Sequence, residues 1–126
     1  MSSHNQQLGK RGESIVARQL AASGFRIIAH NVRIGRLGEL DIIAQREGVV
    51  HIIEVKTRTS AAFGEPELAV DVRKQQTMRR VWEAARRRHG REWGIGIDSD
   101  VQFDVAAVTV GSERAELVWY RNIDLS

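Results

Sequence analysis

The sequence contains no cysteine, so disulfides and zinc sites built on cysteine ligands are both excluded. It also lacks any long apolar run. Its longest apolar stretches are about strand length, well short of the roughly 20 residues that span a bilayer. The N-terminal segment MSSHNQQLGKRGES has no apolar core of the kind found in secretory signals. We therefore expect a soluble cytoplasmic protein with no membrane contact.

Lysine is scarce, and arginine supplies 16 of the 19 positive charges, for a net charge of +3. The length of 126 residues predicts a single domain over residues 1–126. Eight arginines gather in one stretch of the chain: Arg58, Arg73, Arg79, Arg80, Arg86, Arg87, Arg88 and Arg91. Such a stripe is the footprint expected of phosphate binding. An equally good interpretation is that arginine fills exposed helix positions.

Hydrophobic periodicity predicts an α/β fold. Apolar residues at helical spacing predict helices over residues 6–23, ended by Gly24, and from Glu65 to about His89, followed by a loop from Gly90 to Asp100. Strands are expected over residues 25–33, 39–45, 49–58, 101–110 and 116–122, with an Arg46-Glu47-Gly48 hairpin between the second and third. This order indicates a mixed sheet flanked by helices.

Two acids and a lysine interrupt the apolar central strands. Glu54 and Lys56 are two residues apart, so both side chains leave the same face of the sheet, and Asp41 interrupts the preceding strand. A buried carboxylate needs a compensating cation or hydrogen-bond donors. Mg²⁺ or Mn²⁺ would provide it, since these ions take oxygen ligands and keep several waters.

The same residues have a structural interpretation, in which an Asp/Glu–Lys salt bridge holds the hairpin together. Acid-x-lysine pairs on strands are common, so Glu54 and Lys56 alone are weak grounds for a catalytic site. The recurrence of an acid at Asp41, within apolar surroundings, favours a metal or catalytic site. That site requires Asp41 to pair across from Glu54, or diagonally, because a slip of one residue would send the acids to opposite faces.

GELDIIAQ, followed thirteen residues after Asp41 by EVKTR, resembles the PD-(D/E)xK nuclease superfamily. More closely, the chain resembles the YraN-type family of small uncharacterised bacterial proteins, related in fold to archaeal Holliday-junction resolvases. The resemblance covers residues 9–110 and includes GKRGE, NVR, FGEP, RKQQ and FDV. It implies an αβββαβ restriction-endonuclease-like core.

The resemblance also implies roles for individual residues. Asp41, Glu54 and Glu13 would be metal ligands, and Lys56 the catalytic lysine. Lys74 and Gln75 match polar residues that other branches bring to the site from the second helix. The chain departs from the pattern at Gln102, where an arginine is expected before FDV, and at Leu40, where the superfamily has its proline.

The remaining candidate functional residues are three arginines and the four histidines. Arg33, Arg36 and Arg58 flank the site in sequence and either contact phosphates or are ordinary solvated arginines. The four histidines show no ligand spacing, and His51 is expected on the face opposite Glu54, without a catalytic role.

The leading hypothesis is a Mg²⁺- or Mn²⁺-dependent endonuclease acting on nucleic acid, DNA in preference to RNA and branched DNA by analogy with resolvases. Cutting two strands would call for a homodimer. The alternatives are a nucleic-acid-binding module that kept the fold without turnover, and a structural protein with a salt-bridge cluster.

Overall fold

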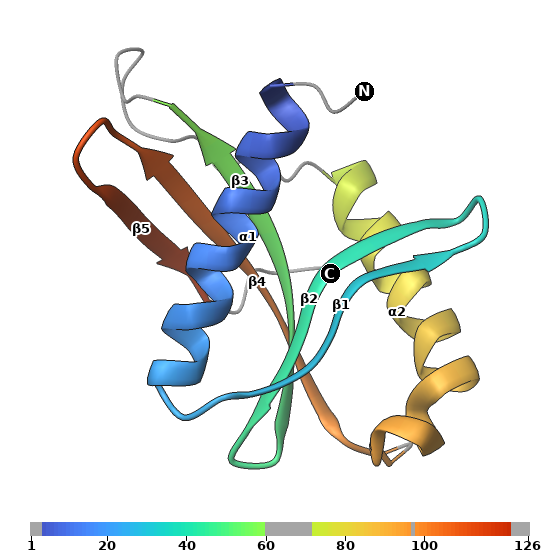
Figure 1. The fold of residues 1–126 in the computed structure, drawn as a ribbon. Coiled ribbons are helices and arrows are strands. Elements are labelled where there is room, and N and C mark those ends of the chain that lie inside the picture. The colour runs from blue at the N-terminus through green and yellow to red at the C-terminus, as the bar shows by residue number, and fades with distance from the viewer. Residues whose placement is uncertain (1–3, 60–71, 97, 122–126) are drawn as a thin grey trace.

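The computed structural model describes residues 4–59, 72–96 and 98–121. The elements, in chain order, are α1 (His4–Ala22), β1 (Arg26–Ile34), β2 (Gly38–Arg46), β3 (Val49–Arg58), α2 (Val72–Trp93), β4 (Asp100–Val110) and β5 (Ala115–Tyr120). Figure 1 shows them as an open sheet with two helices. The predicted α/β fold and the order of its elements are confirmed. No helix in this part of the chain is long and apolar enough to cross a membrane.

The sheet has five strands in the order β1-β2-β3-β4-β5. β1, β2 and β3 form an antiparallel meander, β4 lies parallel to β3, and β5 is antiparallel to β4. The parallel step requires a crossover, because two adjacent parallel strands cannot be joined by a hairpin. Since α2 provides that crossover, the chain has the αβββαβ order expected of a restriction-endonuclease-like core, followed by one more strand.

Each helix packs on its own apolar cluster, and the two clusters lie on opposite faces of the sheet. The cluster under α2 includes Met78, Val81, Trp82, Ile43, Ile52 and Phe103. The cluster under α1 includes Val16, Leu20, Phe25, Ile42, Ile53 and Ala106. Neighbouring residues such as Ile42 and Ile43, or Ile52 and Ile53, belong to different clusters, as the alternation of side chains along a strand requires. The central strands are therefore buried on both faces.

Two glycines end the two helices in the same way. Gly24 has φ +86°, and the N–H groups of Gly24 and Phe25 donate to the carbonyls of Ala21 and Leu20. This is the Schellman arrangement expected at a C-terminal glycine. Gly94, with φ +72°, repeats the arrangement after α2.

The end of α2 was predicted wrongly. The helix continues through Gly90 to Trp93, so the loop begins at Gly94 and not at Gly90. Gly90 is buried inside the helix, where an added Cβ would lie 3.4 Å from the carbonyl oxygen of Ile95. That is an ordinary van der Waals distance, so a side chain would fit at this position, and the chain turns only at Gly94. The predicted start of this helix at Glu65 lies outside the described residues.

Candidate active site

Three polar residues occupy one row across the sheet, on adjacent strands: Asn31 on β1, Asp41 on β2 and Glu54 on β3. The register follows from the neighbouring pairs, which are His30 with Ile42, Val32 with Leu40, and Ile42 with Ile53. Directly opposite residues of antiparallel strands point to the same face. Continuing this register places Asp41 opposite Glu54, so the condition that the sequence set for a shared site is met.

The pairing of β2 with β3 ends at this row. The last paired residues are Ile42 and Ile53, and beyond them the two strands diverge (Figure 1). The backbone N–H of Val55 donates to Oδ2 of Asp41 at 2.8 Å. A side-chain carboxylate therefore accepts the hydrogen bond of a β3 backbone group just past the end of the ladder, and the bond fixes Asp41 where the strands part.

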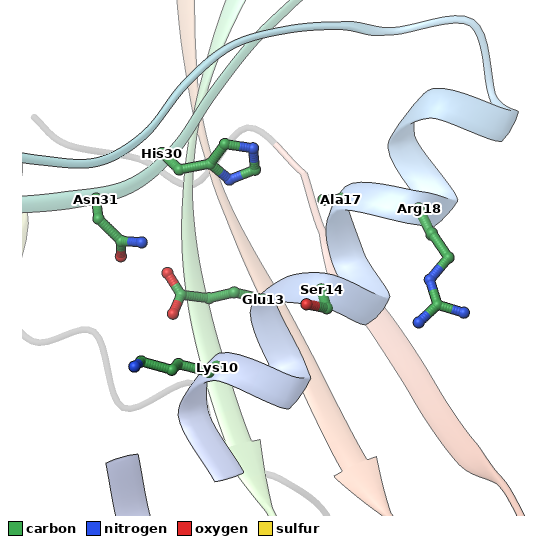
Figure 2. A pocket seen from close by; sticks show the side chains of 7 residues that line it. All are labelled: Lys10, Glu13, Ser14, Ala17, Arg18, His30 and Asn31. Atoms are coloured by element: carbon green, nitrogen blue, oxygen red, sulfur yellow. The ribbon is translucent and has the colours of Figure 1, made fainter. Parts of the chain in front are cut away.

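Asn31 extends the row toward α1. Its φ of +49° is unusual for a residue with a side chain, although asparagine tolerates it better than most. With its amide nitrogen facing the carboxylates, the reverse of the orientation drawn in Figure 2, Asn31 donates to Oε1 of Glu13 at 2.7 Å and to Oε1 of Glu39 at 3.1 Å. The opposite orientation would set an amide oxygen against two carboxylate oxygens. Asn31 thus links an acid of α1 to an acid of β2.

Burial and mutual repulsion raise the pKa of Asp41 to about 7. Burial is the larger cause, and the charge of Glu54 is the next; Glu13 adds to the rise. The Val55 hydrogen bond and the charge of Lys74 act in the opposite direction. Asp41 therefore shares one electrostatic environment with Glu54 and Glu13. Such a shift is typical of functional sites, though not confined to them.

Glu13 belongs to the same group of acids. Burial, followed by the charges of Glu39 and Glu54, raises the pKa of its carboxyl, while Lys10 lowers it. Glu13 comes from α1 and Glu54 from β3, so two elements far apart in sequence bring these carboxylates within electrostatic reach. Glu13 points at Asn31 and at the acid cluster.

A close contact between α1 and β3 holds Glu13 in place. The neighbouring residue, Gly12, is buried, and a Cβ added to it would overlap the side chain of Thr57. Only glycine lets the helix approach β3 this closely. Because Thr57 follows Lys56 directly, this contact sets the distance between Glu13 and the end of β3.

Two lysines face the carboxylate of Glu54. Nζ of Lys74 lies 3.2 Å, and Nζ of Lys56 3.7 Å, from Oε1 of Glu54. The Glu54 side chain is 8% exposed, whereas those of Lys56 and Lys74 are 41% and 37% exposed. Both ammonium groups therefore sit at the solvent side of a buried acid, where they can also reach a bound anion.

The other predicted residues lie on the same strands and helix as the cluster or in the turn between β1 and β2. Gln75 is half-buried on α2 beside Lys74, and Arg58 ends β3, two residues after Lys56. Arg33 is exposed near the end of β1, and Arg36 is exposed in the turn to β2. Within the described residues, neither Arg33 nor Arg36 has a hydrogen bond or ion pair with the acids.

Two members of the cluster, Asn31 and Glu39, were missed by sequence reasoning. Glu39 falls within the GELD motif and was assigned no role. Counting back through the β1–β2 hairpin from Asp41 leads to Asn31 at the facing position. The signal was therefore present, but it becomes readable only once the turn length is known.

The opposite face holds a separate buried polar group. Nδ1 of His51 lies 2.8 Å from Oδ2 of Asp104, which is fully buried, and Nε2 of Gln102 donates to the other carboxylate oxygen at 3.0 Å. His51 also meets the ring of Phe25 edge-on at 4.9 Å. The predicted placement of His51 away from Glu54 is confirmed. Gln102, where the resemblance led us to expect an arginine, supplies a donor to Asp104.

The described acids do not form a complete set of protein ligands for a metal ion. Within residues 4–59, 72–96 and 98–121, no three His, Asp or Glu side chains have the geometry to hold a metal ion. Asp41 and Glu54 nevertheless present carboxylate oxygens from opposite positions of diverging strands. Two such carboxylates suit Mg²⁺, which is often held by one or two protein carboxylates and otherwise by water and substrate phosphate.

Comparison with known proteins gives a consistent set of relatives. The sequence pattern of the Uncharacterised protein family UPF0102 matches residues 12–108. A UPF0102 protein of Alkaliphilus metalliredigens is 40% identical over 110 residues, covering 87% of this chain and 91% of its own. UPF0102 proteins of Geobacter metallireducens and Chlorobium phaeobacteroides are 34% and 37% identical over 120 and 125 residues, covering 93% and 98% of this chain and 91% and 93% of their own. The matched region includes Glu13, Asp41, Glu54, Lys56 and Lys74.

Proposed function

The chain belongs to the Uncharacterised protein family UPF0102, and since that name assigns no activity, we propose from the site itself that the protein is a metal-dependent nuclease hydrolysing phosphodiester bonds. One observation carries the proposal. Asp41 and Glu54 lie opposite each other where β2 stops pairing with β3, with Lys56 at the same point. This is the chemistry that a PD-(D/E)xK site requires.

Asp41 and Glu54 would hold Mg²⁺ or Mn²⁺, and Glu13 would complete the ligand set, directly or through water. The metal, when bound, would stabilise charge on a phosphoryl oxygen and lower the pKa of a bound water. Glu54 would exchange its present partners, Lys56 and Lys74, for the ion. Burial, and next to it repulsion by Glu54, raises the pKa of Asp41, and this supports the role because a divalent cation would offset both.

The chain's own residues would orient the reaction. Lys56 would then be free to hold the attacking water and to offset negative charge developing on the phosphate. Lys74, from α2, would bind a non-bridging phosphate oxygen. Asn31 would position Glu13 through its hydrogen bond. Val55 would hold one oxygen of Asp41, leaving the other for the metal.

DNA is the proposed substrate in preference to RNA, and branched DNA in preference to plain duplex, by analogy with the resolvases. A homodimer follows from the need to reach two strands with one site per chain. Competition between a four-way junction and a duplex of equal length would test the substrate, and light scattering over a concentration series would test the dimer. Equal binding to both DNAs, with a monomeric mass throughout, would remove the resolvase-like part of the proposal.

The two lysines around Glu54 also favour a second candidate, a nucleic-acid-binding module without turnover. In that case the ion pairs to Lys56 and Lys74 are the final state of Glu54, and the cluster only holds the fold together. Such pairs contribute little when their lysines are partly exposed. These ion pairs would therefore offset little of the burial and repulsion of the clustered carboxylates.

Calorimetric titration of Mg²⁺ and Mn²⁺ into wild type and Asp41→Ala separates the candidates. The nuclease proposal expects binding to wild type only, with metal-dependent cleavage of labelled DNA. Asp98→Ala is a suitable control because Asp98 is exposed in the loop before β4. DNA binding by wild type, with neither metal binding nor cleavage, would establish the binding module instead. If Asp41→Ala kept both metal binding and cleavage, the proposed site would be overturned.

A further inference from the structure

A groove between α1 and β1 begins at the acid cluster and leads away from it. Its lining consists of Lys10, Glu13, Ser14, Ala17, Arg18, His30 and Asn31, and its volume is about 460 Å³. In Figure 2, Lys10 and Glu13 reach from α1 toward Asn31, and Arg18 leaves the same helix farther along. Because Glu13 and Asn31 also belong to the cluster around Asp41, the groove and the candidate active site share a wall.

Cations lie on both sides of Glu13, the one acid among the lining residues that the structure describes. Lys10 lies beside Glu13 at the end shared with the active site, within electrostatic reach of it, and Arg18 lies farther along α1. The other polar side chains of the lining carry hydrogen-bond donors: an ammonium, a guanidinium, a hydroxyl, an imidazole and an amide. Within the described part of the chain, no hydrogen bond or ion pair engages Arg18. The part of the groove beyond Glu13, at Ser14 and Arg18, is therefore suited to an anion, and Lys10 offsets the charge of Glu13 at the other end.

The spacing of these donors suits a chain of anions. Lys10, Ser14 and Arg18 are four residues apart along one face of α1, so successive side chains start about 6 Å from each other along the helix axis. That is comparable to the separation of successive phosphates along one nucleic-acid strand. The small side chain of Ala17 leaves room for sugar between the donors.

We infer that this groove binds the substrate strand on one side of the scissile phosphate, with Lys10 and Arg18 contacting its backbone phosphates. The inference rests on the proposed nuclease function and adds the path of the strand to it. The cluster of Glu13, Glu39, Asp41 and Glu54 repels a polyanion, so cations beside it are needed to hold the substrate there. The occupant is a single strand, because the groove lies between one helix and one edge strand and has room for a nucleotide-sized group.

Binding of a short fluorescent single-stranded DNA to the full chain, measured by anisotropy in EDTA, tests the inference without requiring cleavage. The double variant Lys10→Ala/Arg18→Ala is compared with Arg88→Ala/Arg114→Ala. This control also removes two positive charges from exposed positions, at the end of α2 and in the β4–β5 turn. The groove variant should bind about tenfold more weakly at low salt, and its log–log salt slope should fall by about 1.4, since each single-strand phosphate contact contributes about 0.7.

The control should keep wild-type affinity and slope. Equal binding by the groove variant and the control would overturn the inference, and so would failure of wild type to bind a single strand. Neither outcome touches the metal titration or the cleavage assay, so failure of the groove is distinguishable from failure of the nuclease proposal. A second readout is directional. Shortening the substrate on one side of the cleaved bond should slow cleavage by wild type but not further slow the groove variant, whereas shortening it on the other side should affect both alike.

Discussion

The backbone N–H of Val55 donates to the carboxylate of Asp41 at 2.8 Å, just beyond the last residue pair of β2 and β3. A side chain thus continues a connection between two strands whose backbones have separated. The bond lowers the pKa of Asp41, yet burial and neighbouring acids outweigh it, and the pKa stands at about 7. Asp41 is consequently held in place by the fold, while its ionised form is destabilised by its surroundings.

Asp41→Asn should stabilise the fold at neutral and higher pH. Between pH 3.8 and about 7 the folded carboxyl keeps a proton that the unfolded chain releases, so the free energy of unfolding of wild type falls as pH rises through this range. Asparagine cannot ionise and can still accept from Val55. We expect a gain of roughly 1–3 kcal/mol at pH 8 and almost none near pH 4. Denaturant unfolding at both pH values measures it, and a gap independent of pH would contradict the cause assigned to it.

Metal affinity should rise with pH, whereas the free energy of unfolding of wild type falls. A carboxylate must be ionised to bind a cation, so Mg²⁺ or Mn²⁺ competes with the proton on Asp41. Below about pH 7 the apparent affinity should fall, by up to about tenfold per pH unit for one displaced proton. Calorimetric titration at pH 5.5, 6.5 and 8 in buffers of different ionisation enthalpy measures both the affinity and the proton release. A flat profile would mean that Asp41 does not bind the metal.

Substitution of the proposed metal ligands and of the proposed catalytic lysine should have different effects on metal binding and cleavage. Asp41→Ala and Glu54→Ala should lose metal binding and cleavage together, whereas Lys56→Ala should lose cleavage and keep metal binding. The reason is that an ammonium has no lone pair for a metal and must act on water or phosphate. Lys74→Ala, which also removes an ion pair from Glu54, serves as the comparison. Wild-type cleavage by Lys56→Ala would remove its proposed role.

Two glycines of α1 should respond oppositely to alanine. Gly9→Ala should stabilise the protein by about 0.5–1 kcal/mol, because nothing lies within 4 Å of the added Cβ and alanine favours the helix. Gly12→Ala should destabilise it by about 1–3 kcal/mol, since the Cβ would overlap Thr57. The second change should also shift Glu13 and lower the rate of any cleavage. Thermal unfolding of the two variants provides the comparison, and Thr57→Ala in the Gly12→Ala background should recover part of the loss.

The central part of the site could be predicted from the sequence because alternation along a strand is a strong constraint. Glu54 and Lys56 share a face through their spacing alone, and the two-residue Glu47-Gly48 turn sets the pairing that puts Asp41 opposite Glu54. The same alternation placed His51 correctly on the other face. These conclusions needed only backbone geometry.

The rest depended on tertiary contacts that no local pattern contains. Asn31 joins the cluster through a positive φ and a register counted across a three-residue turn. Glu13 reaches it because Gly12 allows α1 to come close to Thr57. The sequence predicts a loop from Gly90, but the helix continues to Trp93, and after the turn at Gly94 the N–H of Ile95 donates back to the carbonyl of Gly90. For Asn31 and Glu13, the role of the residue depends on its contact with a segment that is distant in the sequence, and the local sequence pattern does not contain that contact.

The row Asn31–Asp41–Glu54 has a consequence for how the protein folds. All three residues lie within the β1–β2–β3 meander, whose strands are joined by two short turns. Contacts so local in sequence form quickly, whereas the parallel pairing of β3 with β4 must wait for the α2 crossover. We therefore expect the carboxylates to come together before Lys74 of α2 offsets their charge. We expect their repulsion to slow refolding as pH rises through 7, and a divalent cation to accelerate it.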